Sequence, residues 1–179
     1  MTKAVMAGAV AMALVSFGAN AAKSQGQGTV NFKGSVIDAP CGIAPESADQ
    51  TIDFGQISKA HLNNDGISMK KNVDIKLVNC DFGTATAPAV LKNNVKVTFS
   101  GVNTGGDLTG LGLSTTNAVI KMSGQDGKLV KFDGATASNS TKLQNGDNTL
   151  RYQAWVQKGD KAVTEGEFSA VANFALAYN

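Results

Sequence analysis

The chain has 179 residues, a formal net charge of +2, and charged side chains at 17% of its positions. This length suits one domain. Nucleic-acid binding normally leaves a basic stripe, and no cluster of Lys or Arg appears along the sequence, so the composition argues against a nucleic-acid partner.

The first 21 residues have the pattern of a signal peptide. Lys3 gives a positive start, residues 4–18 form an apolar run, and Ala19-Asn20-Ala21 is a small-x-small cleavage site. The run is short for a bilayer span. The sequence therefore predicts a signal peptide over residues 1–21, a mature chain that begins at Ala22 or Lys23, and export.

Residues 22–36 form the next segment, and its second half alternates like a strand. Successive strand side chains point to opposite faces, and residues 28–36 at about 3.3 Å each would span roughly 30 Å. After residue 36 the apolar set moves to the other parity, so this segment serves a different sheet or a different molecule from the chain that follows. The residues on the predicted face are Gly28, Val30, Phe32, Gly34 and Val36.

Gly34 lies where a side chain would otherwise occupy the apolar face of this segment. Glycine inside a strand often marks the close approach of another backbone. The alternative is a bulge in an ordinary first strand.

The chain contains two cysteines, Cys41 and Cys80. An even count in an exported protein predicts a disulfide, and a closed loop of roughly 40 residues corresponds to about 4 kcal/mol in the chain-entropy estimate. The alternative is a pair of buried free thiols.

Short strand-like runs separated by Gly- and Asn-rich breaks fill the rest of the chain, with one brief helical turn at residues 56–62. Many short strands without helical periodicity predict an all-β protein, an immunoglobulin-like β-sandwich formed by a single domain over residues 37–179. The expected strands are residues 51–54, 73–78, 95–99, 118–122, 129–132, 149–157 and 167–178.

The last of these strands has an apolar face from end to end and follows a glycine, Gly166. It is predicted to be a terminal strand that needs a partner. The residues of this face are Phe168, Ala170, Ala172, Phe174, Leu176 and Tyr178, and the chain ends at Asn179.

No constellation of residues indicates catalysis, a metal or a cofactor. His61 is the only histidine and is expected to be a solvated loop residue, with no second His or free Cys to complete a metal site. The Asp residues are scattered, and the glycines of residues 101–112 lack the ending of a phosphate loop. Trp155 is expected to pack on the second face of a central strand or at its edge, with a sugar-stacking site as the alternative.

The two ends of the chain complement each other. A sandwich with a missing neighbour beside its last strand exposes an apolar groove, and an alternating extension could fill it by strand addition. If the extension comes from the next molecule, the contact is head-to-tail and generates an open fibre.

The sequence resembles the major pilins of chaperone-usher fimbriae of Gram-negative bacteria, in particular the rod subunits of P pili and related fimbriae. Gly166, fourteenth from the end, and the penultimate Tyr178 match the C-terminal signature of that family. The matching stretches are residues 26–41, 47–58, 74–81 and 163–179.

The resemblance implies an incomplete immunoglobulin fold that lacks its last strand and is completed by donor-strand complementation. On that pattern the residue 28–36 face is the donor strand, the residue 168–178 face lines the acceptor groove and the chaperone-binding strand, and the Asn179 carboxylate is the chaperone's anchoring point. Cys41 and Cys80 match the family's disulfide. The implied partners are identical pilin subunits, a periplasmic chaperone, an outer-membrane usher, and minor tip and anchor pilins.

Two further readings fit the residues less well. In the same system, the chain could be a minor adaptor or terminator subunit. From a different class, it could be an exported carbohydrate-binding β-sandwich, or an exported hydrolase, whose N-terminal strand pairs within its own chain.

Overall fold

The computed structural model describes residues 28–84, 92–104 and 106–179. The chain divides into two units, Met1–Val36 and Ile37–Asn179. The expected signal peptide over residues 1–21 and the start of the expected extension at residues 22–27 lie outside the described residues. Residues 28–36 contain no helix or strand.

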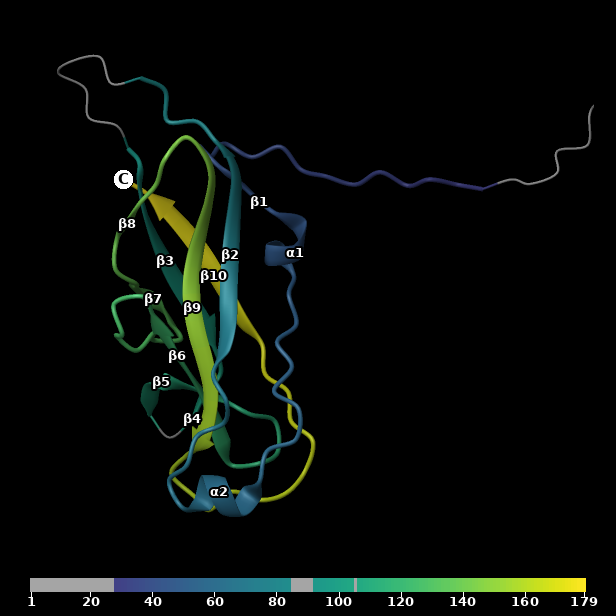
Figure 1. Cartoon of the computed structure of the whole chain (residues 1–179), viewed down its shortest axis with the longest axis vertical. Helices are drawn as coiled ribbons and strands as arrows, with labels where there is room; N and C mark the ends of the chain where they lie inside the picture. Colours follow the sequence, from purple (N-terminus) through teal and green to yellow (C-terminus); the bar gives the residue numbers. More distant parts are fainter. Residues whose placement is uncertain (1–27, 85–91, 105) are drawn as a thin grey trace, which may run out of the picture. The chain divides into compact units, whose positions relative to one another are not determined.

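The larger sheet of the second unit has six antiparallel strands (Figure 1). β9 lies at its centre, between β2 and β6, and pairs with β2 from Lys71–Ala154 to Cys80–Gly146. In spatial order the strands are β1 (Gly42–Ile43), β2 (Lys71–Cys80), β9 (Gly146–Lys158), β6 (Ala118–Gly124), β5 (Asp107–Gly112) and β4 (Asn103–Thr104).

The smaller sheet is built on β3. Both neighbours of β3 are antiparallel to it, and a short strand also pairs with its start. The order is β10 (Ala172–Tyr178), β3 (Asn94–Gly101) and β7 (Asp133–Ala137), with β8 (Thr141–Lys142) paired to β3 off this path.

Two short helices interrupt the chain between β1 and β2. α1 is Pro45–Ala48 and lies beside β2, and the chain then runs to α2, Lys59–Asn63, at the other end of the sheet (Figure 1). α2 starts three residues later than the predicted helical turn, because the Ser58 side chain caps it by accepting a hydrogen bond from the His61 N–H. Among the described residues, no helix has the length and apolar character needed to cross a membrane.

The core lies between the two sheets, where the predicted alternation places it. Ile75 and Leu77 of β2 face Val95, Val97 and Phe99 of β3 across one buried cluster. The Phe99 ring lies 5.0 Å from that of Tyr152, edge to face. The predicted strands at residues 73–78, 95–99, 118–122 and 149–157 are thus confirmed.

Three predicted strands are wrong in whole or in part. Residues 51–54 and 129–132 form no strand, and the last strand begins at Ala172 instead of residue 167. A strand requires a ladder partner. Residues 51–57 bond to no other described backbone group, and residues 168–171 extend past the end of β3. In residues 129–132, Leu129 forms one isolated bridge, while Val130 and Phe132 donate to Met122 and Leu108 on two different strands.

The disulfide prediction is confirmed. Cys41 and Cys80 are bonded, their Cα atoms are 4.1 Å apart, and both are buried. The bond joins the residue before β1 to the end of β2, beside a hydrogen bond from the Asp81 N–H to the Pro40 carbonyl. It therefore fixes the start of β1 to the edge of the larger sheet.

Candidate strand-acceptor surface

The outer edge of β10 has no partner among the described strands. On its inner side β10 pairs with β3 along all 7 of its residues. Asn179 exchanges both backbone hydrogen bonds with Asn94, at 2.9 and 3.0 Å. Bonded and non-bonded pairs alternate in an antiparallel ladder, so the even-numbered residues of β10 turn their N–H and C=O groups outward. This outer side, called the free edge below, presents the backbone groups of Ala172, Phe174, Leu176 and Tyr178.

The same even-numbered residues carry the apolar side chains of β10. Phe174, Leu176 and Tyr178 are half-buried and pack against the main core cluster, whereas Ala172 is exposed. The Phe174 ring lies 6.4 Å from that of Phe99, its register partner. The intervening side chains, those of Asn173, Ala175 and Ala177, are exposed. The free edge therefore combines unpaired backbone groups with an incompletely covered apolar face.

Tyr178 has an unusual environment for a phenol. Its hydroxyl oxygen is buried and has no hydrogen-bond partner among the described residues, and burial raises its pKa above the usual value. A buried hydroxyl without a partner carries an energetic cost, so an added chain that supplied one would be stabilised there.

Residues 51–57 form a second extended segment beside the same core. Phe54 packs against both core clusters, Ile57 against the cluster of Leu62 and Val156, and Phe168 joins that cluster from the other end of the chain. Sequence reasoning did not single out Phe54 and Ile57. The available signal was the alternation of Ile52 and Phe54.

The approach to β10 depends on Gly166, whose φ is +147°. Residues with a Cβ atom rarely adopt this backbone conformation, so the position favours glycine. Further along the chain, the Ser169 N–H donates to the Ser114 hydroxyl, and the Ser169 carbonyl accepts from the Ser114 N–H, both at 3.1 Å. Phe168 and Ala170, flanking Ser169, are half-buried and extend the apolar face of β10.

The predicted donor residues lie in the first unit and carry no regular structure. The side chains of Val30, Phe32 and Val36 are 75%, 90% and 104% exposed. No Cβ added to Gly28 or Gly34 would meet another atom within 4 Å. Within the first unit, no described residue covers this apolar face.

The residues considered for chemistry lie on α2 and β9. His61 is exposed, but it lies in α2 and not in a loop, with its Nε2 3.0 Å from the Ile67 carbonyl oxygen. Trp155 is half-buried on β9, donates to Gln157 at 2.9 Å, and lies under the Lys70 ammonium. Over the described ranges, no three His, Cys, Asp or Glu side chains are grouped to hold a metal ion.

An antiparallel sandwich with an open strand edge, in a chain that also carries an uncovered alternating segment, defines a class of proteins that associate by strand addition. The family described as Fimbrial protein matches residues 30–179. The chain belongs to this family and is a pilin, a structural subunit of an extracellular fimbria on a Gram-negative bacterium.

Relatives of known identity match along almost the whole chain. The F7-2 fimbrial protein of Escherichia coli is 54% identical over 187 residues, covering 99% of this chain and 100% of the relative. The Pap fimbrial major pilin protein of E. coli is 48% identical with the same coverage, and Fimbria A protein of Serratia marcescens is 43% identical, covering 99% and 98%.

Solved structures share the fold. The crystal structure of the P pilus rod subunit PapA has a TM-score of 0.72 and 43% identity, covering 79% of this chain and 100% of that one. A structure of a chaperone-usher pilus, concerned with rod uncoiling, has a TM-score of 0.78 and 45% identity, covering 87% and 97%. These matches confirm the predicted immunoglobulin-like sandwich.

Proposed function

We propose that this pilin polymerises head-to-tail into a fimbrial rod, with residues 22–36 of one copy adding as a strand to the free edge of the next. Residues 1–21 are the signal peptide removed on export, and residues 37–179 are the pilin domain. The rod needs no catalysis or cofactor, and it supports adhesion by carrying the fimbria away from the cell surface.

One observation carries this proposal: the second unit has an open strand edge over apolar side chains, and the first unit has an alternating apolar face. The free edge has backbone groups and half-buried apolar side chains that lack cover, while residues 28–36 have exposed apolar side chains at alternate positions. Burying Val30, Phe32 and Val36 would contribute about 1.5–3 kcal/mol each, and the ladder hydrogen bonds would add to this.

The unpaired backbone of residues 51–57 supports a two-sided contact. An added strand can bond to the free edge on one side and to this segment on the other, and it would cover Phe54 together with Phe174 and Leu176. All of these contacts would have to break together for the strand to leave, so the joint is kinetically stable.

The remaining partners follow from the same surface. Before assembly the free edge would be an aggregation hazard, so a periplasmic chaperone covers it and holds the Asn179 carboxylate, and an outer-membrane usher exchanges the chaperone for the next subunit. Minor tip and anchor pilins join the ends of the rod.

A mixing experiment tests the head-to-tail joint. Phe32→Asp disables the donor, because a carboxylate would be buried in the joint, and Leu176→Asp disables the acceptor for the same reason. Each variant alone should give no fibre, and the two produced together should give a dimer with one intact joint. Lys33→Asp and Ala177→Asp, on the opposite faces of the two strands, are matched controls and should assemble normally.

The result that would contradict the proposal is equally direct. If the mixture gives no dimer and each variant is a stable, complete monomer, the N-terminal strand pairs within its own chain. The chain would then be a monomeric exported module and not a rod subunit.

A further inference from the structure

The larger sheet also has an edge at which a strand could be added, the edge of β2 that faces α1. β1 covers it for two residues only, Gly42 opposite Val78 and Ile43 opposite Leu77. The Ala44 N–H continues the ladder to the Lys76 carbonyl at 3.0 Å. Beyond that point Pro45 has no N–H to donate, so β1 cannot continue.

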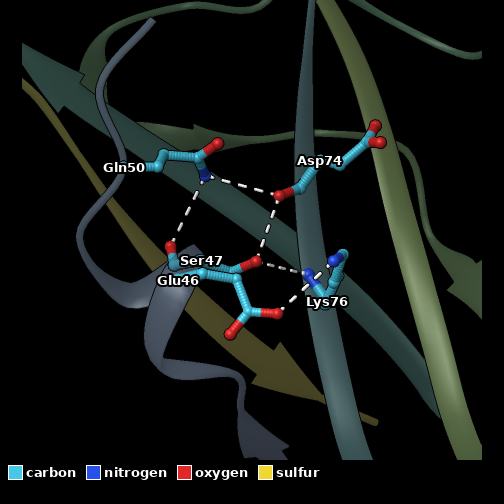
Figure 2. Close-up of polar contacts among 5 residues, drawn as sticks. All are labelled: Glu46, Ser47, Gln50, Asp74 and Lys76. Carbon is cyan, nitrogen blue, oxygen red and sulfur yellow. Dashed lines mark hydrogen bonds and ion pairs between the residues drawn. The ribbon is translucent and has the colours of Figure 1, made fainter.

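The next two backbone groups on this edge are bonded to a side chain instead of a strand. The Ser47 hydroxyl accepts from the Lys76 N–H at 3.0 Å and donates to the Asp74 carbonyl at 3.2 Å (Figure 2). A hydroxyl has one donor and two acceptor sites, so it can serve both groups at once. Ser47 is only 2% exposed, and it thus takes the place of a strand backbone at two consecutive rungs.

Gln50 reinforces this arrangement. Its Nε2 lies 3.4 Å from the Asp74 carbonyl oxygen and 3.5 Å from that of Ser47 (Figure 2). Glu46 also forms an ion pair with Lys76 at 3.4 Å, and both side chains are more than half exposed. Exposed pairs of this kind contribute little. The Ser47 hydroxyl therefore occupies the Lys76 N–H and the Asp74 carbonyl, and this part of the β2 edge is called the closed edge below.

We propose that Ser47 helps to determine where the donor strand adds, by occupying the β2 edge so that the strand adds at the free edge of β10 and not beside β2. This inference rests on the proposed function. Natural sheets protect edges that must not pair. Here the need is acute, because every copy carries an alternating apolar strand able to pair with an unprotected edge. A second acceptor would produce branched or disordered polymers.

Assembled fibres provide the test, since their β10 edges are already filled except at the ends. The probe is a labelled synthetic peptide of residues 28–36, and the measurement is the amount bound per subunit. Wild-type fibres should bind far less than one peptide per subunit. Ser47→Ala fibres should bind at least about tenfold more peptide. In these fibres the peptide no longer competes with the two hydrogen bonds of the Ser47 hydroxyl for the β2 backbone.

Glu46→Gln is the matched control, since it removes the ion pair and leaves the hydroxyl in place; its fibres should bind as little peptide as wild type. If Ser47→Ala yields no fibres, Ser47→Val and Ser47→Thr decide, because they match in shape and differ in the hydroxyl. The proposal is overturned if Ser47→Ala fibres, or Ser47→Val compared with Ser47→Thr, bind no additional peptide. Stoichiometric binding to wild-type fibres would instead contradict the filled β10 edge of the proposed function.

Discussion

The β10 edge of the smaller sheet and the β2 edge of the larger sheet differ in whether their backbone groups have hydrogen-bond partners. At the free edge, β10 leaves the backbone groups of Phe174, Leu176 and Tyr178 unpaired over a half-covered core. At the closed edge, the buried Ser47 hydroxyl bonds to the Lys76 N–H and the Asp74 carbonyl of β2. The proposals assign opposite roles to these two edges: strand addition at β10 and protection from strand addition at β2.

The largest expected effect comes from a charge at the free edge. Leu176→Asp should abolish fibre formation, because a carboxylate sealed beneath an added strand loses several kcal/mol of hydration. Fibre yield measured on cells against Ala177→Asp checks this, since Ala177 is exposed on the other face of β10. Normal yield from Leu176→Asp would mean that the side chain is not covered on assembly.

The disulfide supports the closed edge by fixing the start of β1 to the end of β2. Removing it in the double variant Cys41→Ser and Cys80→Ser should lower the free energy of unfolding by about 4 kcal/mol through the released loop entropy. Denaturant melts and the level of periplasmic protein measure the change. An unchanged level and melt would show that β1 holds its place without the bond.

Gly34 tests the fit of the donor to the free edge. Gly34→Leu should slow assembly and weaken the joint. The added side chain should cost about 1–3 kcal/mol of binding free energy if the groove there is already well packed. Assembly rates should be compared with Ser35→Leu, which places the same side chain on the opposite face of the donor strand. Equal rates for both variants would contradict the proposed register.

Gly166 controls the path of the chain into β10. Gly166→Ala should destabilise the subunit by about 1–3 kcal/mol, because an alanine must hold a φ near +147°. The melting temperature of this variant should be compared with that of Gly127→Ala. Gly127 also has a positive φ but is distant in sequence from β10. Fibre yield should fall for the Gly166 variant only.

The smallest effect is expected away from both edges. On β5, hydrogen bonds from Lys121 and Thr109 lower the pKa of Asp107 from 3.8 to about 2. A lowered pKa in the folded state adds stability above pH 4 that is lost as the pH falls toward 2. Asp107 is about half exposed, so Asp107→Asn should cost only about 1 kcal/mol at neutral pH, and the cost should vanish once the pH falls below about 2. A constant difference between the two melts across this range would contradict the assignment.

Sequence reasoning could predict which side chains face the core, because period-two alternation follows directly from strand geometry. Val95, Val97 and Phe99 lie as expected, and so do Phe174 and Leu176. Ile52 and Phe54 are likewise half-buried, yet residues 51–54 form no strand, since residues 51–57 bond to no other described backbone group.

The closed edge could not be predicted in this way. Ser47 occupies a short polar stretch, PESA, that looks like an ordinary turn after Pro45. Its role depends on the position of Asp74 and Lys76, 27 and 29 residues away in sequence, which only the folded arrangement determines. The short strand β1 is not among the predicted strands, and Pro45 explains only why it stops, since the group that replaces it comes from tertiary structure.

Amide hydrogen exchange, residue by residue, tests the central claim most directly. The unassembled subunit, held as the Phe32→Asp variant, should exchange quickly at Phe174, Leu176 and Tyr178 and slowly at Ala175, Ala177 and the Lys76 amide of the closed edge. In wild-type fibres the even-numbered amides should become protected while Lys76 stays as it was. Even-numbered amides that are protected before assembly, or that still exchange quickly in the fibre, would contradict strand addition at the free edge.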